Sequence, residues 1–409
     1  MDLREQLEQL RRTVAKIDRK YADPKPPRPA PSARVEEVLS GSVVSTAYGE
    51  HFETERLWER HRRHGCVYMS DLAELSGNLL DSLSDGEIQN CLPTQWAFLD
   101  TETTGLAGGA GTYAFLIGVG HATYDGFRLR QFFMRDFAEE SSLLDSLEKY
   151  LAQFEVLITY NGKTYDQPLL ETRFAMARRR HPFDRLRHLD LLYGARRLWK
   201  LRLESCRLIQ LENQILGVER EGDLPGELIP YYYFEYVRTQ QALRLVPIFH
   251  HNAIDILSLA CLTAIVPQAF QAPEETRFRH GADLIGLARW LLRAERHDEA
   301  LRLFRRAVDL GLPDHLLFQT LWETAVLEKR LGRMAAALAG FTDLAASRNP
   351  YRVRALEEVA KYYEHSERNY VMALEVTRSA LDITDTPELR RREQRLGKRV
   401  VRPRMGRLI

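Results

Sequence analysis

Two carboxylates, Asp100 and Glu102, follow the apolar run at residues 96–99 and stand two positions apart. On a β-strand, residues i and i+2 point to the same face, so these two acids would lie side by side. Like charges held together repel each other, and hard divalent cations that bind carboxylate oxygens remove the repulsion. The pair therefore predicts a metal-binding strand, while a solvated strand end is the alternative for such a pair taken alone.

Two later acids have surroundings that make them candidates for the same site. Asp166 lies between an Asn161-Gly162 turn and a helix that begins near Pro168, although Asp at this place also commonly caps a helix. Asp255 lies on an otherwise apolar helix, where an unpaired charge is costly. His251 precedes Asp255 by four residues and shares its helical face, and a surface ion pair is the alternative there.

These stretches resemble the motifs of the ribonuclease-H-like 3′→5′ exonucleases known as the DEDD group. The string D-T-E-T-T-G-L at 100–106 resembles the first motif, and N-G-K-T-Y-D-Q-P-L-L at 161–170 is close to the second motif of the YprB-type branch. The string H-N-A-I-D at 251–255 resembles the third. The resemblance implies an α/β ribonuclease-H-like domain with a mixed sheet and flanking helices. It also implies four metal-ligating carboxylates: Asp100, Glu102, Asp166 and Asp255.

The same resemblance implies the reaction. Two Mg²⁺ or Mn²⁺ ions suit an all-oxygen ligand set and promote hydrolysis of phosphodiester bonds. His251 is the favoured general base, since it stands in the register of the related Y-N-x-x-D motif. His250 fits the other register of the superfamily, and the choice between the two histidines stays open. Thr103 and Asn161 are expected to contact the substrate, with a purely structural role as the alternative for Asn161.

A basic segment follows the second motif. Residues 173–207 contain eleven lysines and arginines against three acids. Clustered cations next to a predicted nuclease site favour contact with phosphates over solvated helix faces. Arg196 and Arg197 are the candidate substrate contacts.

The chain of 409 residues is long enough for two or three domains. After Pro267 the composition becomes helical, and Ala288, Ala300, Phe304 and Ala307 recur 37 positions later as Ala325, Ala337, Phe341 and Leu344. This period resembles tetratricopeptide repeats. The predicted organisation is an N-terminal helix (1–22), a Pro-rich linker (23–34), a lead-in region (35–95), a ribonuclease-H-like exonuclease domain (96–268), tetratricopeptide-like helical repeats (280–385) and a solvated basic tail (386–409).

Composition restricts where such a protein would work. The net charge is +1, so any nucleic-acid signal must be local. The four cysteines form no C-x-x-C pair, which favours neither a zinc site nor a disulfide framework. The charged N-terminus lacks a signal-peptide core, and the longest apolar run, 253–266, is short for a membrane span. We expect a cytoplasmic protein with no membrane partner.

The predicted function is two-metal-ion 3′→5′ exonuclease activity on single-stranded DNA or RNA, with the helical repeats available to a protein partner. Two alternatives remain at this stage. One is a catalytically silent module that binds nucleic acid or proteins, and the presence of all four acids argues against it. The other is a structure-specific endonuclease on the same fold.

Overall fold

The structure, a computed structural model, describes residues 34–84, 86–105, 111–220 and 222–401. The predicted N-terminal helix at 1–22 and nearly all of the Pro-rich linker lie outside the described residues. Two compact units divide the chain at Gln271, and Arg197–Glu204 belongs with the second unit although it precedes that boundary. Each unit has its own set of helices and strands and is described separately.

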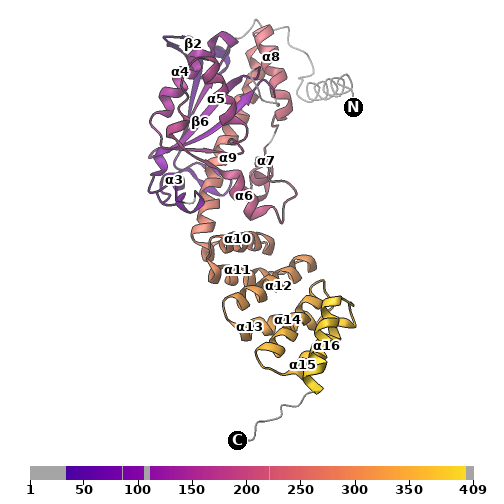
Figure 1. Ribbon diagram of the computed structural model, residues 1–409. Helices are drawn as coiled ribbons and strands as arrows, with labels where there is room; N and C mark the ends of the chain where they lie inside the picture. The colour runs from indigo at the N-terminus through magenta and orange to yellow at the C-terminus, as the bar shows by residue number, and fades with distance from the viewer. Residues whose placement is uncertain (1–33, 85, 106–110, 221, 402–409) are drawn as a thin grey trace, which may run out of the picture. The chain divides into compact units, whose positions relative to one another are not determined.

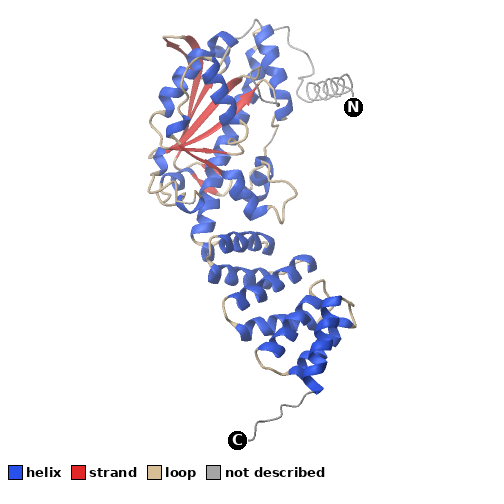
Figure 2. Cartoon of the chain, viewed as in Figure 1, coloured by secondary structure: helices blue, strands red, loops and turns tan. Residues whose placement is uncertain are grey.

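A seven-stranded mixed sheet forms the centre of the first unit (Figures 1 and 2). Its strand order is β1-β2-β7-β6-β5-β8-β9, antiparallel from β1 to β5 and parallel across β5, β8 and β9. The strands are β1 (Gly41–Thr46), β2 (Gly49–Glu59), β5 (Trp96–Thr103), β6 (Ala114–Thr123), β7 (Gly126–Phe133), β8 (Val156–Thr159) and β9 (Arg187–Asp190). The predicted mixed sheet with flanking helices is confirmed.

Residues 35–95 are part of this unit. Strands β1 and β2 extend the main sheet, because β2 pairs along β7 from Phe52 to Glu59. The rest of the region supplies α2 (Val35–Val38), the two-stranded ribbon β3 (Arg63–His64) and β4 (Val67–Tyr68), α3 (Met69–Ala73) and the 3₁₀ turns η1 (Asp81–Leu83) and η2 (Pro93–Gln95). The lead-in region therefore completes the sheet of the predicted exonuclease domain.

Helices cover the sheet, and one of them crosses β5. The main helices of this unit are α4 (Glu140–Leu151), α5 (Asp166–Met176), α6 (Leu191–Trp199), α7 (Leu208–Leu211), α8 (Ile229–Thr239) and α9 (Val246–Gln271). Helix α9 packs against β5 and β6. Its approach is close because β6 presents glycines, and a Cβ atom on Gly118 would lie 2.3 Å from the Asn252 Oδ1 atom.

Helix α9 extends beyond the apolar run at residues 253–266 in both directions. Together with the preceding turn it forms an apolar helical span, Ala242–Gln271, of 30 residues, which is long enough to cross a membrane. In the fold, 78% of its most apolar window is buried inside the protein. Its apolar side chains therefore form part of the core next to β5 and β6.

The second unit is helical in its described part. Its helices are α10 (Gly281–Arg293), α11 (His297–Asp309), α12 (Asp314–Arg330), α13 (Met334–Ala346), α14 (Arg352–His365), α15 (Tyr370–Leu381) and α16 (Pro387–Val401), after the turn η8 (Pro273–Glu275). The helices α10/α11, α12/α13 and α14/α15 pack as successive pairs. The recurrent small and aromatic positions are buried in both copies, for example Phe304 and Phe341. The predicted all-helical region is confirmed.

Residues 387–401 of the predicted basic tail form helix α16, on which most of the basic side chains are exposed. Leu389 and Leu396 are buried there. The buried carboxylate of Glu364 on α14 forms ion pairs with Arg392 and Arg395. Two basic residues of this segment are therefore partners of a buried acid. Glu364 is too far away in the sequence for this pairing to be predicted from spacing.

Gly118→Ala should destabilise the first unit and displace α9 from β6. The added methyl group would overlap Asn252 and Ile256, and overpacking of this kind costs about 1–3 kcal/mol. Urea unfolding of the full chain measures the change. Gly111→Ala is the control, because a Cβ atom at Gly111 meets nothing within 4 Å. Equal free energies of unfolding for the two variants would contradict this packing account.

Candidate active site

The four predicted carboxylates gather where β5, α5 and α9 meet. Burial raises the pKa of Asp100 well above its usual value, and the charges of Asp255 and Asp166 raise it further. Burial also raises the pKa of Glu102, with added repulsion from Asp100, Asp255 and Asp166. Because each acid acts on the others, the structure joins three distant motifs into one buried acidic site.

Asp166 is the first residue of α5 and contacts strand β5. The Thr101 hydroxyl donates a hydrogen bond to Asp166 Oδ1 over 2.6 Å. Burial raises the pKa of Asp166 to about 6, although this hydrogen bond favours the ionised form. Thr101 lies between the two acids of the first motif, so β5 positions three of the four carboxylates.

The turn before α5 is shaped by a buried acid. Asn161 has a left-handed backbone with φ of 69°, and its N–H donates to Asp190 Oδ1 over 2.8 Å. The Lys163 N–H donates to the other oxygen of Asp190 over 3.2 Å. These contacts give Asn161 a structural role in the turn. Thr103, the other predicted substrate contact, donates its hydroxyl hydrogen to the Gly105 carbonyl over 2.9 Å.

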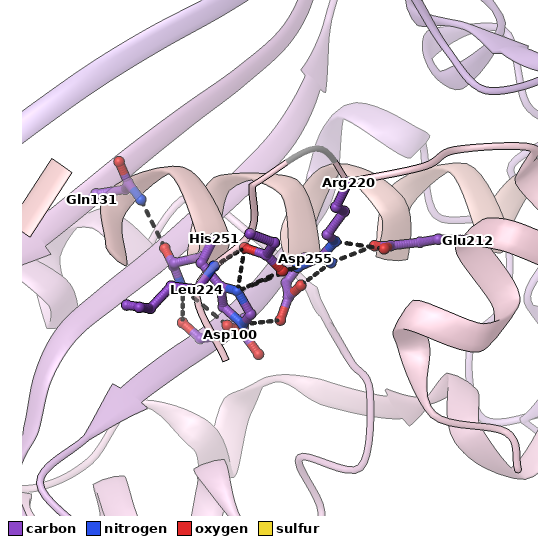
Figure 3. Close-up of polar contacts among 9 residues, drawn as sticks. Asp100, Gln131, Glu212, Arg220, Leu224, His251 and Asp255 are labelled. Carbon is purple, nitrogen blue, oxygen red and sulfur yellow. Dashed lines mark hydrogen bonds and ion pairs between the residues drawn. The ribbon is translucent and has the colours of Figure 1, made fainter. Parts of the chain in front are cut away.

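A polar chain from β7 through α9 orients Asp100. The fully buried Asn252 donates from Nδ2 to Asp100 Oδ2 over 2.9 Å, and its Oδ1 accepts from Gln131 Nε2 over 2.9 Å (Figure 3). Gln131 also donates to the Phe249 carbonyl on α9. Neither amide was predicted as part of the site. A polar residue at a core position of a strand or helix does indicate a buried hydrogen-bond partner.

The structure distinguishes the two histidines. His251 Nδ1 lies 2.9 Å from Asp223 Oδ1, and its Nε2 lies 3.6 Å from Asp255 Oδ2 (Figure 3). Burial opposes protonation of His251, but the hydrogen bond to Asp223 and the charge of Asp255 outweigh it and raise its pKa. His250 is exposed, and burial of part of its ring together with the charge of Arg56 lowers its pKa. Only His251 lies against the carboxylate cluster.

One cation, missed in the sequence, balances part of the acidic site. Arg220 forms ion pairs with Asp255, with Glu212 and, over 3.0 Å, with Asp223 (Figure 3). Glu212 is fully buried at the start of the π-helical turn Glu212–Leu216 and holds the guanidinium in place. These contacts raise the pKa of Arg220 against the effect of burial. Asp255 thus has an arginine as its positive partner.

The donor set fits hard divalent cations. Within the described residues, no three His, Cys, Asp or Glu side chains already form a metal ligand shell. The reason is visible in the contacts, since Asp255 faces Arg220 and Asp166 accepts from Thr101. Four carboxylates supply the oxygen ligands that Mg²⁺ and Mn²⁺ prefer. Burial and mutual repulsion raise the pKa values of Asp100 and Glu102, so Arg220 balances only part of the acidic charge.

The basic segment 173–207 does not act as one surface. Arg173 is buried and pairs with Glu140 over 2.5 Å, and Arg179 pairs with Asp145 and Glu148. Arg197 stacks over Trp290 at 5.1 Å, within the second unit. Arg196 is exposed, and it is the last residue of α6 that belongs to the first unit. Several arginines of this segment therefore hold the fold together, and contact of the exposed ones, Arg196 among them, with phosphates stays a prediction.

The sheet order, the crossing helix and the acid cluster define a ribonuclease-H-like protein, and residues 97–266 match the RNase_H superfamily. The chain is also similar to the protein YprB of Bacillus subtilis (strain 168). The two are 32% identical over 329 residues, which cover 78% of this chain and 77% of that relative. The chain therefore belongs to the YprB family of proteins with an RNase_H superfamily domain.

The Asp166 carboxyl should contribute less to the stability of the metal-free protein as the pH rises. A carboxyl with a raised folded-state pKa binds its proton more tightly when folded, so its stabilising effect is complete below the unfolded pKa and disappears above the folded one. For Asp166 this window runs from 3.8 to about 6. The loss amounts to at most about 3 kcal/mol, since one pKa unit corresponds to about 1.4 kcal/mol.

Urea unfolding across this pH window, in a chelator and then in excess Mg²⁺, measures the effect. Asp166→Asn should remove part of the fall in the free energy of unfolding, and Mg²⁺ should restore stability to the natural protein but much less to this variant. An identical pH dependence in both proteins, with no response to Mg²⁺, would contradict the account.

Proposed function

We propose that the protein is a metal-dependent nuclease that removes nucleotides from the 3′ ends of single-stranded DNA or RNA. The observation that carries the proposal is the convergence of Asp100, Glu102, Asp166 and Asp255 from three motifs on one buried site. Glu102 is buried and the other three acids are half-buried. Gathering them without a ligand is unfavourable, because each ionised group loses hydration and repels its neighbours. A site that binds two Mg²⁺ or Mn²⁺ ions accounts for that arrangement.

Two divalent ions bound there would activate the attacking water and stabilise charge on the leaving oxygen. The protein's own groups then have separate tasks. Asn252 holds one oxygen of Asp100, and Thr101 holds one oxygen of Asp166, so the remaining oxygens stay directed into the site. Arg220 forms an ion pair with Asp255, and a bound metal ion would replace Arg220 as the positive partner of that acid.

His251 is arranged to accept a proton. Asp223 accepts from Nδ1, which fixes the tautomer with a free lone pair on Nε2, and Nε2 faces Asp255. A histidine oriented by a carboxylate is a common general base. In this proposal Nε2 takes the proton of the attacking water, and Asp223 stabilises the resulting imidazolium ion.

The helical unit supports a second part of the proposal, that its repeats are tetratricopeptide-like and bind a protein partner. The recurrence of buried positions between α10/α11 and α12/α13 is the supporting observation. Stacked helical pairs of this kind present extended surfaces to partners. The chain would then combine a nuclease with an adaptor region in the cytoplasm.

Asp100→Ala, Glu102→Ala, Asp166→Ala and Asp255→Ala should each abolish metal-dependent degradation, because each removes a metal ligand. The assay follows an end-labelled single strand in Mg²⁺, Mn²⁺ and chelator, and products shortening from the 3′ end establish polarity. Asp184→Ala is the control, since the Asp184 side chain is 60% exposed and remote in sequence from the motifs. Full activity in any two of the four variants would rule out the two-metal assignment.

Internal cleavage would favour an endonuclease, and an inactive natural protein would favour a silent binding module.

His251→Ala should slow the chemical step by roughly 10²–10⁴-fold, the usual effect of losing a general base. His250→Ala should cost far less, because His250 is exposed and His251 alone lies beside Asp255. Single-turnover cleavage of a labelled strand measures both. A larger loss in His250→Ala would reverse the assignment, and small equal losses would show that neither histidine is the base.

A further inference from the structure

A basic hollow lies at the end of β2. Six residues line a space of about 540 Å³: Arg56, Leu57, Trp58, Glu59, Arg62 and Arg63. Strand β1 pairs with β2 only as far as Thr54, so in the described part of the chain the segment after Thr54 has β7 on one side and no strand on the other. The hollow is therefore open along a strand edge.

The charges in the hollow differ from those around it. Nearby arginines have carboxylate partners: Arg60 pairs with Glu74, Arg128 with Glu55 and Arg130 with Glu53. Among the described residues, Arg56, Arg62 and Arg63 have no such partner, and all three are exposed. The single acid of the lining, Glu59, leaves the hollow with a net positive charge. A fold that neutralises adjacent arginines but leaves these three available favours an anionic ligand.

Aromatic rings accompany the three cations. The Arg56 guanidinium lies 4.5 Å from the centre of the Trp58 ring, and that of Arg63 lies 5.5 Å from the centre of the Tyr68 ring. Tyr68 is 46% exposed, so its ring is accessible. Guanidinium groups beside the half-buried ring of Trp58 and the exposed ring of Tyr68 suit a ligand that carries both phosphates and flat bases.

The hollow is tied to the catalytic helix. Arg62 and Arg63 immediately precede His64, whose Nε2 lies 2.7 Å from the hydroxyl oxygen of Ser258 on α9. Ser258 follows Asp255 by three residues, about one turn along the helix. The ribbon β3–β4 is fixed in place, because the Met69 N–H donates to the Arg62 carbonyl over 3.0 Å. Arg56 also lies near enough to His250 for its charge to act on that ring.

We propose that this hollow binds single-stranded nucleic acid outside the carboxylate site and guides the strand toward α9. The arginines contact phosphates, and Trp58 and Tyr68 stack with bases. The inference deepens the proposed nuclease function and rests on it for the direction of the strand. It adds a second candidate contact surface to the exposed cations of the segment 173–207.

Binding without cleavage tests the proposal. A fluorescently labelled single strand is titrated with the full chain in chelator, at several salt concentrations. The triple variant Arg56→Gln, Arg62→Gln, Arg63→Gln should bind the strand more weakly. The slope of log affinity against log salt should become shallower by about 2, because each of the three lost phosphate contacts contributes roughly 0.7. Trp58→Ala should weaken binding by roughly 5- to 150-fold, the range for loss of one stacked base.

A second triple variant, Arg330→Gln, Arg348→Gln, Arg354→Gln, removes the same charge from exposed positions of the helical unit and should bind like the natural protein. Equal affinity and salt slope in both triple variants would overturn the proposal. Equally tight binding of a polyglutamate of the same charge would also overturn it, because the hollow would then recognise acidic protein. Hydrolysis in Mg²⁺ is measured separately, so an inactive protein that still binds through the hollow would contradict only the proposed nuclease function.

Discussion

The gathering of four carboxylates in one place, with Glu102 buried and the other three half-buried, is the constraint on which the rest of the first unit depends. Ionised acids in a protein interior require hydrogen bonds and countercharge, or they take up protons instead. The fold supplies the hydrogen bonds through Asn252 and Thr101 and supplies one countercharge through Arg220. The raised pKa values of Asp100 and Glu102 show that this is insufficient. The remaining deficit of positive charge is the physical basis for expecting metal ions.

The scaffold places the acids by close packing. Helix α9 must approach the sheet near enough for Asn252 to reach Asp100, and glycines on β6 leave the space. Gln131 on β7 then fixes the amide from the other side. Because these contacts link β5, β7 and α9, the geometry of Asp100 depends on three elements that are far apart in the sequence. The same helix carries His251 and Asp255.

The sequence predicted the parts of this arrangement that depend on local spacing. The i, i+2 pair on β5, the acid at the start of α5 and the His–Asp pair on α9 all followed from periodicity and from the resemblance to a known family. Arg220, Asp223 and Asp190 could not be found this way, because their roles arise only when loops fold back on the motifs. The basic hollow was missed for a related reason, since Arg56, Arg62 and Arg63 look in the sequence like their neighbour Arg60, which has a carboxylate partner. Only the structure shows which of the neighbouring arginines are neutralised.

The central claim is that the acid cluster binds two divalent ions. Calorimetric titration of Mn²⁺ into the metal-free chain tests this claim most directly, with Asp100→Asn as the comparison, because that change preserves the size of the side chain. The account predicts binding of two ions per chain in the natural protein and weakened or incomplete binding in the variant. Absence of binding to the natural protein, or binding that Asp100→Asn leaves unaltered, would contradict it.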